Sequence, residues 1–232
     1  ELAPAAFDIK STFRDRIGVD KVETEMPFFK DGFFIKEKDR MKINEAITAN
    51  NSNYIMPIIQ HIYNDAKNLI DSSDVTCERM RMQLLSSGVI AISANRQAYN
   101  YDYKFSSAHK ETLLSTAKWS DTANSDPISD ILRWQKAIND DTGVTPTRAI
   151  CTSKTWNYLL ANQKIRLGVN ALNANGANVP INKPQLQNYL SIMCDGLQVA
   201  VYDKRFRTVG GVVTAFFPDE VFTLHPDSIL GN

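Results

Sequence analysis

Apolar residues follow a helical period in one long stretch in the first half of the chain. Seven of them recur on one helical face between residues 52 and 70: Ile55, Ile58, Ile59, Ile62, Ala66, Leu69 and Ile70. Pro57 is compatible with this helix because we expect it in the first turn, where its missing N–H is not needed. A polar break at 71–74 precedes a second helical stretch over 75–87, and Gly88 is a suitable stop. The two stretches together predict one long, slightly broken helix.

A period of two follows this helix. Residues 89–93 predict a strand, and residues 95–97 predict a polar turn after it. Aromatic residues then alternate with polar ones, at Tyr99, Tyr101, Tyr103 and Phe105. Such alternation is typical of a half-buried strand with its aromatic residues on one face. We therefore predict a β-hairpin in this region.

Helices and strands alternate in the rest of the chain. The expected elements are a helix from Asp126-Pro127 to Gly143, a strand over 147–152, a helix capped by Ser153, an exposed loop over 163–182, a helix opened by Pro184, a strand over 197–201 and a turn at Gly210-Gly211. The last residues, 216–232, predict two short apolar strands around Pro218-Asp219. This alternation favours an α+β or mixed α/β body.

The start of the chain has a different pattern. From Phe7 to Asn44 we expect extended chain, with apolar runs at 26–29 and 33–35 on either side of an Asp-Gly turn. Asp-Gly between apolar runs is a strong hairpin signal because glycine accepts a positive φ. Two interpretations of the aromatic residues stay open. They pack on the chain's own body, or they form an arm that another subunit covers.

Dense charges follow this predicted hairpin, over residues 36–42. They form either a solvated strand edge that discourages wrong pairing, or a rim that sets the register against a neighbouring subunit. The candidate inter-subunit contacts are the aromatic and basic side chains of the predicted arm: Phe28, Phe29, Phe33, Phe34, Lys36, Lys38 and Arg40.

The composition limits the possible functions. The chain has 232 residues and a formal net charge of zero, so we expect one main body with extensions and no general affinity for nucleic acid. No apolar run reaches the roughly 20 residues that span a bilayer, and no signal-peptide pattern opens the chain. We expect a soluble protein made in the cytosol. Both ends look cut, so we also expect that the sequence is a fragment or an ordered core whose flexible ends are missing.

No pattern of catalytic or metal-binding residues stands out. His61, His109 and His225 lie in three different predicted elements, without a second ligand at metal spacing. The three cysteines are far apart and odd in number, which indicates buried free thiols. Nucleophile elbows, phosphate loops and dinucleotide fingerprints are absent. We therefore predict no catalytic, cofactor-binding or metal-binding site and no enzyme activity.

Several segments, taken in order, resemble tailed-phage major capsid proteins of the lambda E type. They are Arg14-Asp15-Arg16 leading to Met26-Pro27-Phe28-Phe29, the long helix ending near Leu85, Tyr101-Asp102-Tyr103, Trp119 before Asp126-Pro127-Ile128, Trp156 with Asn162, and Phe217-Pro218-Asp219 followed by Leu230-Gly231. Each motif is loose, and their order over nearly the whole chain carries the resemblance.

The resemblance implies the Hong Kong 97-type capsid fold, an α+β fold with an extended E-loop hairpin, a spine helix, a peripheral domain and an axial domain. By matching order, it implies an N-terminal segment and E-loop arm at 1–44, a peripheral domain at 45–105, an axial domain at 106–215, and strands returning to the periphery at 216–232 with a truncated C-terminus. The loop over 163–182 would be an axial feature.

The resemblance also implies a structural role in a virion. The partners would be other copies in hexameric and pentameric rings, packaged DNA by non-specific contact, and scaffold, decoration and portal proteins, with no membrane and no cofactor. Assembly would take place in the cytoplasm of the host bacterium. Two alternatives stay open at this point: an encapsulin-like shell of the same fold that holds enzyme cargo, and an unrelated soluble α/β enzyme.

Overall fold

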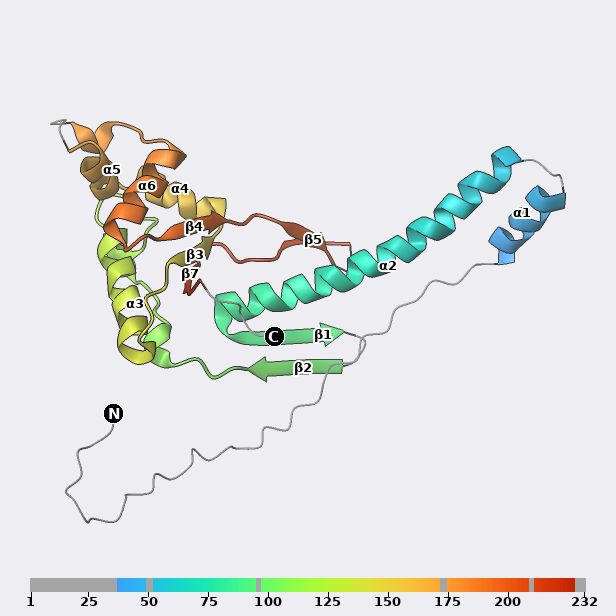
Figure 1. The fold of residues 1–232 in the computed structure, drawn as a ribbon, viewed down its shortest axis with the longest axis horizontal. Coiled ribbons are helices and arrows are strands. Elements are labelled where there is room, and N and C mark those ends of the chain that lie inside the picture. Colours follow the sequence, from blue (N-terminus) through green and yellow to red (C-terminus); the bar gives the residue numbers. More distant parts are fainter. Residues whose placement is uncertain (1–36, 49–51, 95–96, 172–174, 209–210, 228–232) are drawn as a thin grey trace, which may run out of the picture. The chain divides into compact units, whose positions relative to one another are not determined.

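The structure, a computed structural model, describes residues 37–48, 52–94, 97–171, 175–208 and 211–227. Its helices are α1 (Glu37–Thr48), α2 (Ser52–Ser87), α3 (Pro127–Thr142), α4 (Ser153–Ala161), α5 (Gln163–Val169) and α6 (Lys183–Met193), with short 3-10 turns at Ser107–His109, Ser115–Ala117 and Gly176–Asn178. Its strands are β1 (Val89–Ala94), β2 (Gln97–Asp102), β3 (Arg148–Cys151), β4 (Gln198–Val201), β5 (Arg205–Arg207), β6 (Val213–Ala215) and β7 (Phe222–His225). The protein is thus a mixed α+β fold with small sheets (Figure 1).

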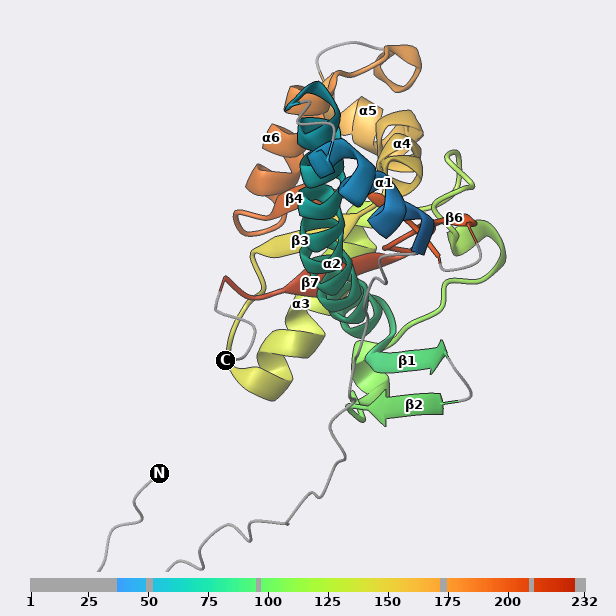
Figure 2. The ribbon, with the colours of Figure 1, turned by 90° about the vertical axis from the view of Figure 1, so that its right-hand side faces the viewer.

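The largest sheet of the described residues has the order β4-β3-β7. β4 runs parallel to β3 and β7 runs antiparallel to it, so Ile150 lies opposite Ala200 on one side and Thr223 on the other. Figure 2 shows β3 between its two neighbours. A parallel pair needs a long crossover, and α4, α5 and α6 supply it here.

The larger hydrophobic core joins these crossover helices and α3 to the sheet. Its members with no exposed surface include one or two residues from each helix: Ile131, Leu159, Ile165, Leu186 and Leu190. Full burial of such a side chain contributes about 1.5–3 kcal/mol. This core is the larger of the two hydrophobic clusters among the described residues.

Local chemistry fixes the ends of α3 as predicted. The Asp126 side chain accepts a hydrogen bond from the Ser129 N–H, at 3.3 Å, and Pro127 occupies the first helical position. Gly143 ends the helix with φ of 73°, a conformation that costs glycine least. The helix that Pro184 opens is also confirmed, with Asn182 as its N-cap.

The predicted hairpin is confirmed as β1 and β2, with Ile90 opposite Tyr101 and Ile92 opposite Tyr99. Its second strand is shorter than the aromatic alternation suggested. β2 ends at Asp102, whose side chain accepts a hydrogen bond from the Lys104 N–H, and Lys104 has a positive φ of 49°. Tyr103 and Phe105 therefore lie beyond the strand.

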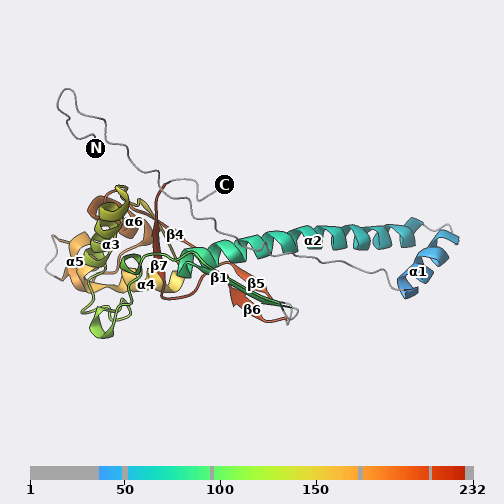
Figure 3. The ribbon, with the colours of Figure 1, turned by 90° about the horizontal axis from the view of Figure 1, so that it is seen from below.

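Three predictions about local structure were wrong. Residues 37–44 were expected to be extended, yet they form most of α1. Residues 71–74 were expected to break the long helix, yet α2 runs through them without interruption, as Figure 3 shows. Residues 163–169 were expected in an exposed loop, yet they form α5.

The structure gives the physical reason for two of these errors. In α2, the Ser72 hydroxyl donates to the Asn68 carbonyl and the Thr76 hydroxyl to the Ser72 carbonyl, so polar side chains bond back to the helix instead of ending it. In α5, the Asn162 side chain caps the Ile165 N–H at 3.1 Å, and Ile165 is fully buried. A short helix is stable there because the core holds it.

Smaller corrections concern caps and strand ends. Pro57 is the sixth residue of α2 and lies beyond its first turn. Ser153 does not cap α4 with its own side chain; its N–H and hydroxyl both donate to the Asp203 carboxylate. Phe216 and Phe217 follow β6 as buried non-strand residues, while the second strand predicted near the end is confirmed as β7.

Candidate assembly surfaces

The C-terminal end of α2 is attached to the body by a second hydrophobic cluster. Met82 of α2 is 8% exposed and packs in this cluster with Ile150 of β3, Phe216 and Phe217. Phe217 is only 1% exposed. Leu85 of α2 lies at its margin. The C-terminal turns of the helix thus share a core with the central strand of the sheet.

Polar contacts reinforce the same attachment. The Tyr202 hydroxyl donates to the Glu78 carboxylate at 2.6 Å, and the Thr223 hydroxyl donates to the Leu85 carbonyl at 2.9 Å. Burial and the Glu78 carboxylate both raise the pKa of the Tyr202 phenol above its ordinary value. The phenol therefore stays protonated at neutral pH and remains a donor.

The earlier part of α2 and the short α1 have a different surface. Among the side chains of these helices whose burial the structure describes, the exposed large apolar ones, which we call the exposed helix surface, are Met41 (59% exposed), Ile47 (59%), Met56 (56%), Ile70 (65%) and Val75 (36%). Scattered apolar residues are normal on a protein surface, and these five do not share one helical face, so we treat them as a candidate contact region and not as a contiguous patch. The sequence pattern placed the candidate contacts further toward the N-terminus and missed Met41 and Ile47.

The structure tests the position of only two of the predicted contact residues. Lys38 and Arg40 belong to α1, so they lie in a helix and not on the predicted extended arm. Two positions apart on a helix, they do not share one face. The other five predicted contacts lie outside the described residues: Phe28, Phe29, Phe33, Phe34 and Lys36. A role of all seven in contacts between subunits stays a prediction.

The described histidines and cysteines form no catalytic arrangement. His109 Nε2 lies 3.2 Å from the exposed Asp141 carboxylate, and His225 Nδ1 lies 3.2 Å from the Pro226 carbonyl. Burial raises the pKa of the Cys151 thiol to about 12 and that of the Cys194 thiol to about 11. Neutral thiols of this kind are poor nucleophiles.

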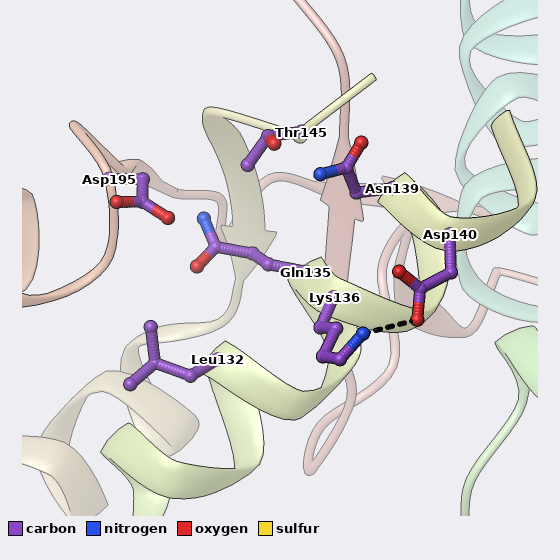
Figure 4. A pocket seen from close by; sticks show the side chains of 7 residues that line it. All are labelled: Leu132, Gln135, Lys136, Asn139, Asp140, Thr145 and Asp195. Carbon is purple, nitrogen blue, oxygen red and sulfur yellow. Dashed lines mark hydrogen bonds and ion pairs between the residues drawn. The ribbon is translucent and has the colours of Figure 1, made fainter. Parts of the chain in front are cut away.

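A hollow of about 200 Å³ lies beside α3, and Figure 4 shows the side chains that line it. Its wall includes the Lys136–Asp140 ion pair, at 2.6 Å, and Asp195. Gln135 also lines it, with its Nε2 donating to the Pro146 and Cys194 carbonyls at 2.9 and 3.1 Å. Gln135 therefore joins α3 to two loops. The hollow contains no nucleophile and base in contact, and we assign it no chemistry.

Within the described ranges, no group of three or more His, Cys, Asp and Glu side chains could hold a metal ion. None of the helices in the same ranges is both long and apolar enough to cross a membrane. What the described surface offers is apolar contact area on helices, together with a helix firmly attached at one end. These features are typical of a structural protein that works by contact with other proteins.

Residues 2–231 match the family of phage major capsid protein E. The chain belongs to this family, and the resemblance inferred from the sequence motifs is confirmed. The family is one of structural proteins of the phage capsid. No curated protein matches the sequence.

Solved structures of phage-related proteins have a similar fold. A phage-related protein from Bordetella bronchiseptica RB50 shares 16% identity with a TM-score of 0.50, over 72% of this chain and 46% of that one. A presumed capsid protein of a prophage from Escherichia coli CFT073 also shares 16% identity with a TM-score of 0.50, over 85% of this chain and 55% of that one. The chain thus spans about half the length of each. At this identity the likeness concerns the fold alone.

Proposed function

We propose that this chain is the repeating subunit of an icosahedral phage head with the Hong Kong 97-type fold. Copies assemble into hexameric and pentameric rings, and the rings close around double-stranded DNA. The observation that carries the proposal is the family match over residues 2–231. It favours a phage head over a nanocompartment that holds enzyme cargo and over a soluble enzyme.

The exposed helix surface supports this assembly. A closed shell needs one chain to make contacts with different patches of its neighbours, repeated around each ring. Apolar side chains that are 56–65% exposed, such as Met56 and Ile70, lower the free energy of association when a neighbour covers them. The attachment of α2 at Met82 fixes the helix to the body, so contacts along the helix orient the whole subunit.

We assign parts of the capsid fold by position in the sequence. Residues 1–44 form the N-terminal segment and arm, of which residues 37–44 belong to helix α1 and are not extended chain. Residues 45–105 form the peripheral domain with α2 as spine helix, 106–215 the axial domain, and 216–232 the return to the periphery. Long α2 followed directly by the β1–β2 hairpin supports the peripheral assignment. The crossover helices α4 to α6, which pack around one hydrophobic core, support the axial assignment.

We propose that the assembled protein resides in the virion, after assembly in the cytoplasm of the host. Contact with DNA is non-specific, and it is weak because a formal net charge of zero leaves no excess of cations to neutralise phosphates. Scaffold, decoration and portal proteins are its further partners. Its role requires no catalysis.

Electron microscopy of the protein expressed alone tests the proposal. We expect uniform shells or rings of five and six subunits in negative stain. Monodisperse monomers at high concentration would contradict it. Genes for a portal and a terminase beside the capsid gene support a phage head, whereas a neighbouring cargo enzyme would indicate a nanocompartment.

A further inference from the structure

Two side chains of α2 form hydrogen bonds with the main chain at the outer edge of β1, so that this edge is closed to pairing with another strand. The Tyr103 N–H donates to the Gly88 carbonyl, so Gly88 points its main-chain groups toward the side of strand β2. In an antiparallel pair every second residue does so, and the register gives Ile90 and Ile92 the same direction. Val89 and Ala91, which lie between them, direct their main-chain groups away from β2. Gln83 Nε2 donates to the Ala91 carbonyl at 3.2 Å, and Gln83 Oε1 accepts from the Ala91 N–H at 3.2 Å. The Gln83 carboxamide thus occupies the place of a residue in an adjacent antiparallel strand.

The same edge is closed at the next outward-facing residue. The Ser87 hydroxyl oxygen accepts from the Val89 N–H at 3.2 Å and lies 3.1 Å from the Val89 carbonyl oxygen. Gln83 and Ser87 are one helical turn apart, so both lie on the side of α2 that faces β1. Two successive outward positions of β1 therefore already have hydrogen-bond partners.

A glutamine of another helix closes β4 in the corresponding way. The Gln198 N–H donates to the carbonyl of Thr147, the residue before β3, so Gln198 points its main-chain groups toward β3. Successive residues of a strand point in opposite directions, so Leu197 and Val199 direct their main-chain groups outward. Gln187 of α6 donates to the Leu197 carbonyl at 3.0 Å and accepts from the Val199 N–H at 3.2 Å. In a parallel sheet, one residue bonds to two residues of the neighbouring strand that flank the residue opposite it. The Gln187 carboxamide bonds in this way to the two residues that flank Gln198.

The two closures are independent and reproduce two different strand patterns. The outer edge of β2 provides the contrast: Ala98 and Asn100 direct their main-chain groups outward by the same register. No described residue provides a side-chain partner for these groups, as Gln83 does for Ala91.

We propose that Gln83, with Ser87, and Gln187 determine the specificity of assembly by closing the β1 and β4 edges to other copies of this chain. The inference rests on the proposed function, because a shell protein is present at high local concentration next to its own copies. An open strand edge presents unpaired N–H and C=O groups to which a strand of another copy can bond. Pairing at β1 or β4 would bind two copies outside the ring geometry, and a carboxamide on the edge prevents this pairing.

Amide-resolved hydrogen exchange tests whether the closures exist in solution. Gln83→Ala removes both bonds to Ala91, and we expect exchange at the Ala91 amide to rise about tenfold, with Ile90 and Ile92 in the ladder unchanged. Gln187→Ala should act likewise on the Val199 amide. The matched control is Gln163→Ala, because Gln163 is an exposed glutamine of α5, away from both strand edges.

Cross-linking tests the consequence for assembly. In an antiparallel pair of two β1 edges centred on Ala91, the two Ala91 Cα atoms lie about 5.5 Å apart, within the range that a disulfide bridges. In a Cys77→Ser background, we expect Ala91→Cys to give disulfide-linked dimers on mild oxidation only when Gln83→Ala is also present. Ala91→Cys with Gln163→Ala should give none.

The outcomes separate this proposal from the proposed function. Unchanged exchange at Ala91 in the Gln83→Ala protein, or equal dimer yields with and without Gln83→Ala, would overturn the closure of β1 even if shells form. Failure of the unaltered protein to form rings or shells would overturn the proposed function, and with it the role of the closures in assembly.

Discussion

The two parts of α2 differ in how far their apolar side chains are exposed. Met82, near the end of the helix, is 8% exposed in a cluster with Phe216 and Phe217. Met56, in the same helix, is 56% exposed, and Ile70 is 65% exposed. One continuous helix thus has a methionine that its own fold covers and, further toward its start, described apolar side chains that it leaves exposed. In the proposed shell, we expect another subunit to cover the second part.

The largest expected effect is the difference in the free energy of unfolding between a substitution in one part of α2 and a substitution in the other. Met82→Ala should lower the free energy of unfolding by about 2–3 kcal/mol, because it removes a buried side chain and leaves a cavity. Met56→Ala, the matched control on the same helix, should change it by less than about 0.5 kcal/mol. Urea denaturation followed by circular dichroism measures both. Equal losses in the two variants would mean that the contrast between the two parts is false.

A smaller effect concerns the polar attachment. Tyr202→Phe removes the hydroxyl that donates to Glu78, and we expect urea denaturation to show a loss of about 1–2 kcal/mol. Tyr103→Phe is the control, because Tyr103 is 54% exposed and outside the attachment. A Tyr202→Phe protein as stable as the unaltered one would show that the hydrophobic cluster alone holds α2.

The smallest expected effect is that the contribution of Asp203 to the stability of the body depends on pH. Hydrogen bonds from the Ser153 side chain and N–H lower the pKa of Asp203 below its ordinary value of 3.8. The resulting stability is present above the unfolded pKa and is lost as pH falls through the lower folded pKa. Asp203→Asn should therefore be less stable than the unaltered protein near neutral pH, and the gap should close below pH 3.8. Urea midpoints measured from neutral to acid pH test this. A gap that is constant over the whole range would assign the effect to packing alone.

Local signals in the sequence predicted much of the body. Asp126-Pro127 and Gly143 bound α3 because a cap, a fixed φ and a left-handed residue act within a few positions. The β1–β2 hairpin was predictable from its alternation. The family was predictable from the order of several loose motifs, and the family model confirms it over residues 2–231.

Elements that depend on distant residues were predicted less well. α5 is a seven-residue helix stabilised by burial of Ile165, and its only local signal is the Asn162 cap. The hairpin signal at Asp31-Gly32 led us to expect extended chain as far as Asn44. Helix α1 was missed for this reason, although its charged residues are good helix formers. The bonds from Gln187 to β4 depend on how α6 packs against the sheet, which the spacing of residues does not reveal.

Burial of the exposed helix surface in the assembled shell is the central claim, and oxidation of methionine side chains tests it most directly. Peroxide oxidises exposed methionine to the sulfoxide, and mass spectrometry measures the extent at each residue. In the unassembled protein, Met41 and Met56 should react much faster than Met82. In shells, Met41 and Met56 should become protected while Met82 keeps its slow rate. Equal oxidation of Met56 in shells and in unassembled protein would contradict the account.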